Sequence, residues 1–421
     1  MKKFIGFLLS LCLLVTLFAG CEPKAEATGK VYYLNFKPEQ DAAWQKLAKT
    51  YKDQTGVEVY VVTASQGSYE ETLTAEIDKS NAPTLFQLSG ETALDSWQDY
   101  CLDLSDSDVY KQLNDDDFAL KRDGKVYGVG YVYEGFGLIV NKALLSKAGY
   151  EMKDIKDFAS LKAVAEDITA RKGELGFSAF TSSTLDSNSS WRFSGHLANI
   201  PLYYEFRENK VEKQPKEISG TYLSSFKNLW DLYINNATIP PSQITTAVNG
   251  AEEFAAGKAV FYQNGTWAYE DIKALGDENL GILPIFAGVN DQSQGLCCGT
   301  ENYWAVNAQS SDADITATLD FLKWVVTSDE GTRALAEDMG FLSPFKKAKP
   351  VKNPLANQMN DYIEGGNYNV SWAFNLTPNT TAWRNELVSA LAAYSTSKGE
   401  WSAVEKAFVD GWKKQYEASH S

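Results

Sequence analysis

The chain has 421 residues and a formal net charge of −16 at pH 7, and aromatic residues make up 13% of it. So acidic a protein is a poor partner for nucleic acid or for anionic lipid. It has only two histidines, His196 and His420, and five cysteines, which is little material for a zinc site or for histidine-based catalysis. We therefore expect no metal and no cofactor.

The first twenty residues have the pattern of a bacterial signal peptide. Residues 1–3 are a short basic stretch, residues 4–20 are almost entirely apolar, and small residues stand just before Cys21. Residues 17–21 (LFAGC) resemble a lipobox, in which the cysteine is acylated and becomes the first residue of the mature protein, although Phe18 stands where leucine is usual. An ordinary cleaved signal and an uncleaved anchor are the alternatives.

The chain after the signal is expected to be tethered by lipid. Residues 21–30 are polar and flexible in composition, so we predict a signal peptide over 1–20 and a tether over 21–30. Acylation of Cys21 would hold the protein on the extracellular face of the cytoplasmic membrane. Loss of Lys2 and Lys3 with the signal changes the net charge from −16 to −18.

The first part of the mature chain alternates strands and helices. Strand-forming runs at 31–36, 57–62 and 84–88 are separated by helical apolar spacing at 42–51 and 69–79. This order predicts a doubly wound α/β sheet with parallel strands and helices on both faces. In such sheets ligands bind beyond the carboxyl ends of the strands. The loops at those ends carry no glycine-rich phosphate motif, which excludes a nucleotide site of that type.

The remaining chain continues as α/β and becomes helical from about residue 314 to its end. About 400 residues follow the signal, more than one ordinary domain, so we expect two lobes. The later strands are expected at 126–132, 135–140, 260–263, 281–285 and 303–306, and helices at 142–148, 226–235 and 251–256.

Several segments in order resemble the extracellular solute-binding proteins of bacterial carbohydrate ABC importers, family 1, the group that includes maltose-binding protein. Each segment alone is weak, but together they span most of the mature chain behind a lipobox. They are residues 123–131 (DGKVYGVGY), 137–142 (GLIVNK), 257–269 (GKAVFYQNGTWAY), 302–307 (NYWAVN), 321–331 (FLKWVVTSDEG) and 340–344 (GFLSP).

This resemblance implies a two-lobed periplasmic-binding-protein-like fold of type II, hinged by crossover strands that let the lobes close on a ligand. The first lobe would comprise 31–131 plus 301–328, and the second 132–300 plus 329–421. It also implies a non-enzymatic, monomeric protein that captures an oligosaccharide and delivers it to the membrane permease subunits of an ABC importer.

Aromatic candidates for sugar contact come from polar or glycine-rich segments. A sugar ring stacks its apolar face on flat aromatic rings. The resemblance makes Trp267 the main candidate, because the family has a stacking tryptophan there; packing under the following helix is the alternative. Trp191 lies in a serine- and asparagine-rich stretch and could contact a ligand or pack on the surface. The same two interpretations apply to Trp372, Phe374 and Trp383.

Polar candidates follow the first three strands or lie in the crossover segments. Carboxylates and amides can pair with neighbouring sugar hydroxyls, although each such residue could equally be a helix cap or a solvated surface residue. The candidates after the strands are Asn35, Glu39, Gln40, Gln66, Ser68 and Glu91, together with the aromatic Phe36; those in or beside the crossovers are Tyr131, Tyr133, Glu134, Asn264 and Glu301.

Cys297 and Cys298 are adjacent in a segment where the family usually has glycines lining the cleft. They could form a vicinal disulfide that presents a flat apolar face to a sugar, or remain two partly buried thiols.

Two other functions compete with sugar capture. One is a cell-surface glycan-processing enzyme that uses two carboxylates, and the other is the same fold binding a non-sugar solute such as a peptide. No segment matches a catalytic motif, and the richness in aromatic residues favours a sugar.

Overall fold

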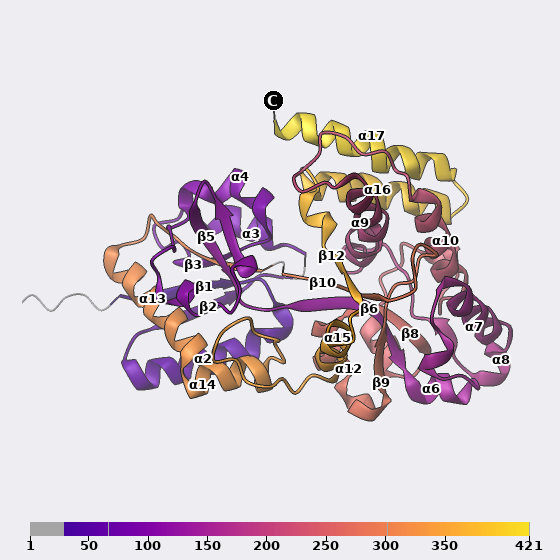
Figure 1. The fold of residues 1–421 in the computed structure, drawn as a ribbon, viewed down its shortest axis with the longest axis horizontal. Helices are drawn as coiled ribbons and strands as arrows, with labels where there is room; N and C mark the ends of the chain where they lie inside the picture. The colour runs from indigo at the N-terminus through magenta and orange to yellow at the C-terminus, as the bar shows by residue number, and fades with distance from the viewer. Residues whose placement is uncertain (1–28, 66, 301, 421) are drawn as a thin grey trace, which may run out of the picture.

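A computed structural model describes residues 29–65, 67–300 and 302–420 as two α/β lobes that lie side by side (Figure 1). The signal peptide, Cys21, Gln66 and Glu301 lie outside the described residues. Within the described ranges no helix is both long and apolar enough to span a membrane.

The first lobe is built on a six-stranded sheet whose strand order is β2-β1-β3-β11-β5-β4. β1 pairs in parallel with β2 and β3, as the alternation of strands and helices predicts. β11 pairs antiparallel with β3 and β5, and β4 pairs antiparallel with β5. The strands are β1 (Val31–Asn35), β2 (Val59–Thr63), β3 (Leu85–Leu88), β4 (Ala119–Arg122), β5 (Lys125–Gly130) and β11 (Tyr303–Val306).

Helices cover both faces of this sheet. α2 buries Trp44, Leu47, Ala48 and Tyr51, which lie on one stripe of the helix, and it ends at Gly56 in a left-handed conformation (φ 77°). One core contains Trp44 and Tyr33, while Tyr32 lies in the core on the opposite face, as expected for successive strand residues. The helices are α2 (Asp41–Thr55), α3 (Tyr69–Glu76), α4 (Leu94–Trp97), α5 (Asp108–Lys111), α13 (Asp312–Thr327) and α14 (Asp329–Arg333).

The second lobe has a sheet of order β12-β10-β6-β8-β7, with β9 paired to β6. Its strands are β6 (Glu134–Asn141), β7 (Ser178–Phe180), β8 (Ala259–Gly265), β9 (Leu280–Leu283), β10 (Gln294–Gly299) and β12 (Tyr368–Ser371). Its helices are α6 (Lys142–Lys147), α7 (Phe158–Ala170), α8 (Lys172–Leu175), α9 (Ala198–Asn209), α10 (Leu223–Asn235), α11 (Gly250–Ala255), α12 (Tyr269–Ile272), α15 (Pro354–Glu364), α16 (Thr380–Ser395) and α17 (Trp401–Ser419).

Strand β12 departs from the expected helical end of the chain. It has four residues and pairs with β10 at one end of the sheet. A strand this short has too few residues to show an alternating pattern, so the sequence gives no signal for it.

The chain crosses between the lobes three times: between β5 and β6, between β10 and β11, and after the helical region that follows α13. Residues from 334 to 345, among them Leu335 and Phe341, pack in the core of the first lobe. Gln40 adds to this attachment, because its Nε2 donates to the Met339 carbonyl at 3.2 Å. We therefore place the last crossing after Phe345 rather than at residue 328.

Candidate functional site

The two lobes meet around a buried ammonium group, that of Lys37 in the loop after β1. Its Nζ donates to both carboxylate oxygens of Glu134, each at 2.9 Å, and lies 3.7 Å from a carboxylate oxygen of Glu39. The side chains of Lys37 and Glu134 are each only 5% exposed. Because Glu134 is the first residue of β6, this ion pair joins the first lobe to a strand of the second.

Trp267 reaches the same place from the second lobe. It follows β8, and its ring lies directly over Gly265, where an added Cβ would come within 2.2 Å of the ring. The ring centroid is 5.7 Å from Lys37 Nζ, within the range of a cation–π contact. Trp267 also packs partly against the apolar cores of the second lobe. It therefore lies between those cores and the loop of the first lobe that carries Lys37. This position fits both of its predicted roles, stacking on a sugar ring and packing under the following helix.

Carboxylates from both lobes surround this contact. Burial raises the pKa of Glu39, and the nearby Lys37 ammonium opposes part of that rise, while Glu134 and Asp271 add to it. Burial also raises the pKa of Asp271, which lies in α12 of the second lobe. Among the described residues, the space between the lobes thus offers carboxylate acceptors together with the Lys37 ammonium, which suits a ligand rich in hydroxyl groups.

Asn35 shapes the loop that presents Lys37. It is fully buried, its Nδ2 donates to the Lys37 carbonyl at 2.8 Å and to Thr63 Oγ1 at 3.1 Å, and its Oδ1 accepts from the Lys37 amide. Its amide is therefore used within the first lobe. Phe36 next to it packs its ring against Tyr69, with centroids 5.3 Å apart.

Ser68 and Glu91 lie in the other two loops after the strands. Ser68 Oγ donates to the Ser65 carbonyl at 2.9 Å, a contact within its own turn. Glu91 is exposed, and its carbonyl accepts from Arg122 at 2.8 Å. Neither side chain joins the cluster around Lys37.

The two tyrosines of the crossover have different surroundings. Tyr131 is fully buried in the first lobe and stacks on Trp304 with ring centroids 4.3 Å apart. The expectation that it faces the space between the lobes is therefore wrong. Tyr133 is partly exposed, and its hydroxyl accepts from Asn369 Nδ2 at 3.3 Å.

Of the other predicted aromatic residues, Trp191 lies near Trp267, whereas Trp383 lies in the core of the second lobe. Trp191 lies 6.3 Å from Trp267 by ring centroids, and its Nε1 donates to the Asn188 carbonyl at 2.8 Å. Trp383 is fully buried, and its Nε1 donates to the Phe408 carbonyl of α17 at 2.9 Å. Trp383 is therefore a core residue of the second lobe, because the helix pair α16 and α17 closes over it.

Trp372 and Phe374 are buried but lie beside a pocket. Their rings are 5.6 Å apart, and Trp372 Nε1 donates to the Cys297 carbonyl at 3.0 Å. Asn264, also buried, donates to the Tyr262 hydroxyl and so is used within the second lobe.

The adjacent cysteines are free thiols in the structure. Cys297 belongs to the main core of the second lobe and Cys298 to its other core. Successive strand residues point to opposite faces of a sheet, so β10 directs the two thiols apart. Burial raises the pKa of Cys298 to about 12. The structure therefore has the two buried thiols and not the vicinal disulfide.

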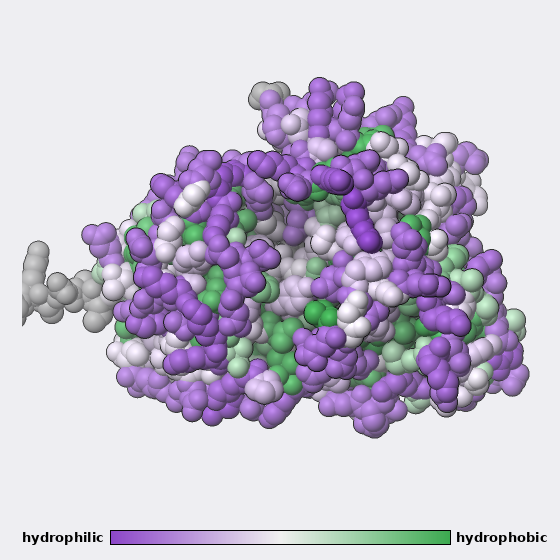
Figure 2. Space-filling model, viewed as in Figure 1, coloured by the Kyte–Doolittle hydropathy of each residue, from purple (hydrophilic) through white to green (hydrophobic). Residues whose placement is uncertain are grey.

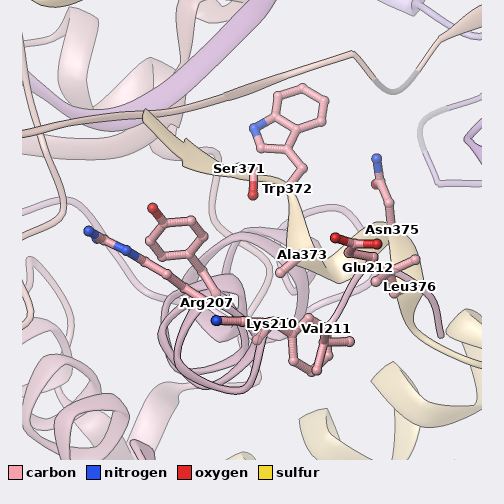
Figure 3. A pocket seen from close by; sticks show the side chains of 11 residues that line it. Arg207, Lys210, Val211, Glu212, Ser371, Trp372, Ala373, Asn375 and Leu376 are labelled. Carbon is pink, nitrogen blue, oxygen red and sulfur yellow. The ribbon is translucent and has the colours of Figure 1, made fainter. Parts of the chain in front are cut away.

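A pocket of about 450 Å³ lies beside the contact between the lobes (Figure 3). Asn375 on its wall accepts a hydrogen bond from Thr92 Oγ1 of the first lobe at 3.2 Å. In the space-filling view the molecule is hollowed between its two lobes (Figure 2). The pocket is lined by Tyr203, Phe206, Arg207, Lys210, Val211, Glu212 and residues 371–373, 375 and 376.

Sequence reasoning missed Lys37, His196 and the pocket wall from α9. Lys37 is the one basic residue in the loops that follow the first three strands, where ligand binding was expected. This isolated positive charge is the sequence feature that could have pointed to it. His196 was considered only for metal binding and catalysis. Tyr203 and Arg207 of α9, and Lys210 directly after it, line the pocket but belong to no sequence motif.

Comparisons with known proteins agree with this architecture. A family model described as bacterial extracellular solute-binding protein matches residues 46–361. A family 1 extracellular solute-binding protein from Bifidobacterium longum subsp. infantis has a TM-score of 0.63 and 22% identity, over 92% of this chain and 100% of that one. The GacH receptor of Streptomyces glaucescens, solved unliganded and with acarbose, has a TM-score of 0.69 and 21% identity, over 93% and 99%.

The raffinose complex of RafE has a TM-score of 0.72 and 15% identity, over 94% of this chain and 100% of that one. At such low identity these solved structures show a shared fold. The family match covers residues 46–361, which is most of the chain. The chain belongs to the family of bacterial extracellular solute-binding proteins.

Proposed function

We propose that this protein is a monomeric, lipid-anchored receptor that captures an oligosaccharide outside the cell and delivers it to the permease of an ABC importer. The observation that carries the proposal is the meeting of Trp267 from the second lobe with Lys37 and Glu39 from the first. An aromatic face with hydrogen-bonding groups around it is what a sugar ring requires. Relatives in fold have been solved with raffinose, acarbose and maltose, which supports the same ligand class here.

Closure of the lobes is the proposed mechanism of capture. The crossings next to β5, β6, β10 and β11 are short, so small backbone rotations there would move one lobe as a body against the other. A ligand that touches both lobes binds the closed form better and shifts the population towards it. No catalytic step or cofactor is needed for this function.

A thermal-shift screen over a panel of oligosaccharides, with EDTA in the buffer, tests the proposal. A ligand that binds only the folded state raises its stability by about 2.7 kcal/mol at a concentration of 100 Kd. We expect one class of oligosaccharide to raise the melting temperature, and the recovered sugar to be intact after a day with the protein. Stabilisation by peptides alone, or hydrolysis of the bound sugar, would instead support one of the competing functions.

Replacement of Cys21 by serine tests the proposed anchor. Cys21→Ser is expected to move the protein from the membrane fraction to the soluble fraction, because the acyl chains are its only attachment in this proposal. Its affinity for the oligosaccharide should stay unchanged, since Cys21 precedes the lobes. Cys101→Ser, a buried cysteine of the first lobe, is the control and should stay in the membrane fraction. A Cys21→Ser protein that is processed and still sediments with membranes contradicts acylation.

A further inference from the structure

Polar atoms without hydrogen-bond partners gather in the second lobe beside Trp191 and Trp267. Among the residues that the structure describes, His196 Nδ1 and both amide atoms of Gln263 are buried and unpartnered. His196 is 5% and Gln263 is 2% exposed. A buried polar group without a partner is costly, so several of them in one place call for an explanation.

The pairing of strands places these groups on one face at one end of the second sheet. Phe136 pairs with Gly265 across β6 and β8, and cross-strand partners share a face. Gln263, two residues before Gly265, shares that face too.

Two rings cover this face. The His196 ring stacks on Phe136, with centroids 4.1 Å apart and planes 7° apart, and the Trp267 ring covers Gly265. His196 and Trp267 meet edge to face, with centroids 5.4 Å apart. His196, Gln263 and Trp267 thus surround the carboxyl end of β8, the edge at which α/β sheets bind ligands.

His196 belongs to a π-helical turn, Arg192–Leu197, that leads into α9. Such turns are rare and occur often at functional sites. Trp191 precedes the turn, and its ring lies 4.9 Å from the His196 ring. Arg192 anchors the turn, because its guanidinium donates to the carbonyls of Gln263 and Ser182 at 3.2 and 3.3 Å.

The imidazole is held neutral. Burial lowers the pKa of His196 well below its usual range, and the charges of Arg384 and Arg192 lower it further. A neutral imidazole carries one donor and one acceptor, and a carboxamide carries both kinds of group as well. These are the partners that a hydroxyl group, itself a donor and an acceptor, can satisfy.

We propose that His196 and Gln263 are specificity-determining residues, which hydrogen-bond neighbouring hydroxyls of the sugar unit held next to Trp191 and Trp267. The inference rests on the proposed function for the nature of the ligand and adds which groups distinguish one sugar from another. A site built to bond a particular hydroxyl rejects the analogue that lacks it, because its own buried groups then stay unpaired.

Calorimetry with the oligosaccharide found in the screen, and with its monodeoxy analogues, tests this inference. His196→Phe keeps the ring stacked on Phe136 and removes the nitrogens, while Gln263→Met keeps the chain length and removes the amide. Each variant is expected to bind the parent sugar about 5- to 150-fold more weakly. Each should also bind one monodeoxy analogue as well as the unmodified protein binds it, because the lost partner is the same.

The control is Thr169→Val, which removes another unpartnered buried oxygen in α7, outside the cluster, and should leave affinity unchanged. Melting curves without ligand show whether each variant is folded, and the selectivity of the unmodified protein among the deoxy analogues tests the idea even if a variant does not fold. This inference alone is overturned if both variants bind the parent sugar as tightly as the unmodified protein does. It is also overturned if the unmodified protein binds all monodeoxy analogues with the same affinity. Failure of the unmodified protein to bind any glycan overturns the proposed function and this inference with it.

Discussion

Trp267→Ala is expected to weaken oligosaccharide binding about 5- to 150-fold, the equivalent of about 1–3 kcal/mol for one lost stacking surface. The ring lies between the second lobe and the loop that carries Lys37, where a sugar entering between the lobes would meet it. Because the ring is only partly buried, its removal leaves a smaller cavity than the loss of a core tryptophan. The melting temperature without ligand should therefore fall little. Titration calorimetry and thermal melts of one variant measure both quantities.

Trp383→Ala provides the opposite case within the same lobe. Trp383 is fully buried under α17, and a Trp→Ala change in a core costs about 3–5 kcal/mol of folding stability. We expect a clearly lower melting temperature and nearly normal affinity of the molecules that remain folded. If Trp267→Ala shows this second pattern, Trp267 is a packing residue and the proposed platform is wrong.

Glu134→Gln is expected to lower the free energy of unfolding by about 3–5 kcal/mol, because it leaves the buried ammonium of Lys37 without its main partner. The loss should lie near the lower end of that range, since Glu39 is 3.7 Å from the same ammonium. Sugar affinity should fall as well, because the pair joins the first lobe to β6 of the second lobe. Urea unfolding measures the stability change and calorimetry the affinity.

The double variant Lys37→Met, Glu134→Gln shows whether the stability loss in Glu134→Gln comes from the unpaired buried charge or from a general packing defect. Removal of both charges of the pair leaves no buried ammonium and only the more exposed Glu39 carboxylate without Lys37, so we expect it to be more stable than Glu134→Gln alone. Lys46→Met breaks the exposed pair with Asp338 and is the matched control, expected to change stability little. A Glu134→Gln protein as stable as the unmodified one would show that the pair is not the attachment inferred from its burial.

The sequence alone determined the order and type of most elements in the first lobe. The apolar runs that become β1, β2 and β3 and the stripe of Trp44, Leu47, Ala48 and Tyr51 on α2 are local signals, set by the periods of strand and helix. Trp267 was singled out by the resemblance of residues 257–269 to a segment of the family, in which a tryptophan follows the end of a strand. Such features depend on near neighbours in the chain.

Only the tertiary structure decided which side chains meet. The pairing of Lys37 with Glu134 joins residues 97 positions apart, and no local pattern encodes it. Tyr131 and Trp383 look like exposed aromatic residues in the sequence, yet Trp304 and α17 bury them. The same holds for His196 and Gln263, whose unpartnered atoms come together because β6 and β8 pair in one register and the π-helical turn lies over that face. Local periodicity specifies elements, whereas burial and pairing depend on contacts between distant segments, which form only when the lobes fold.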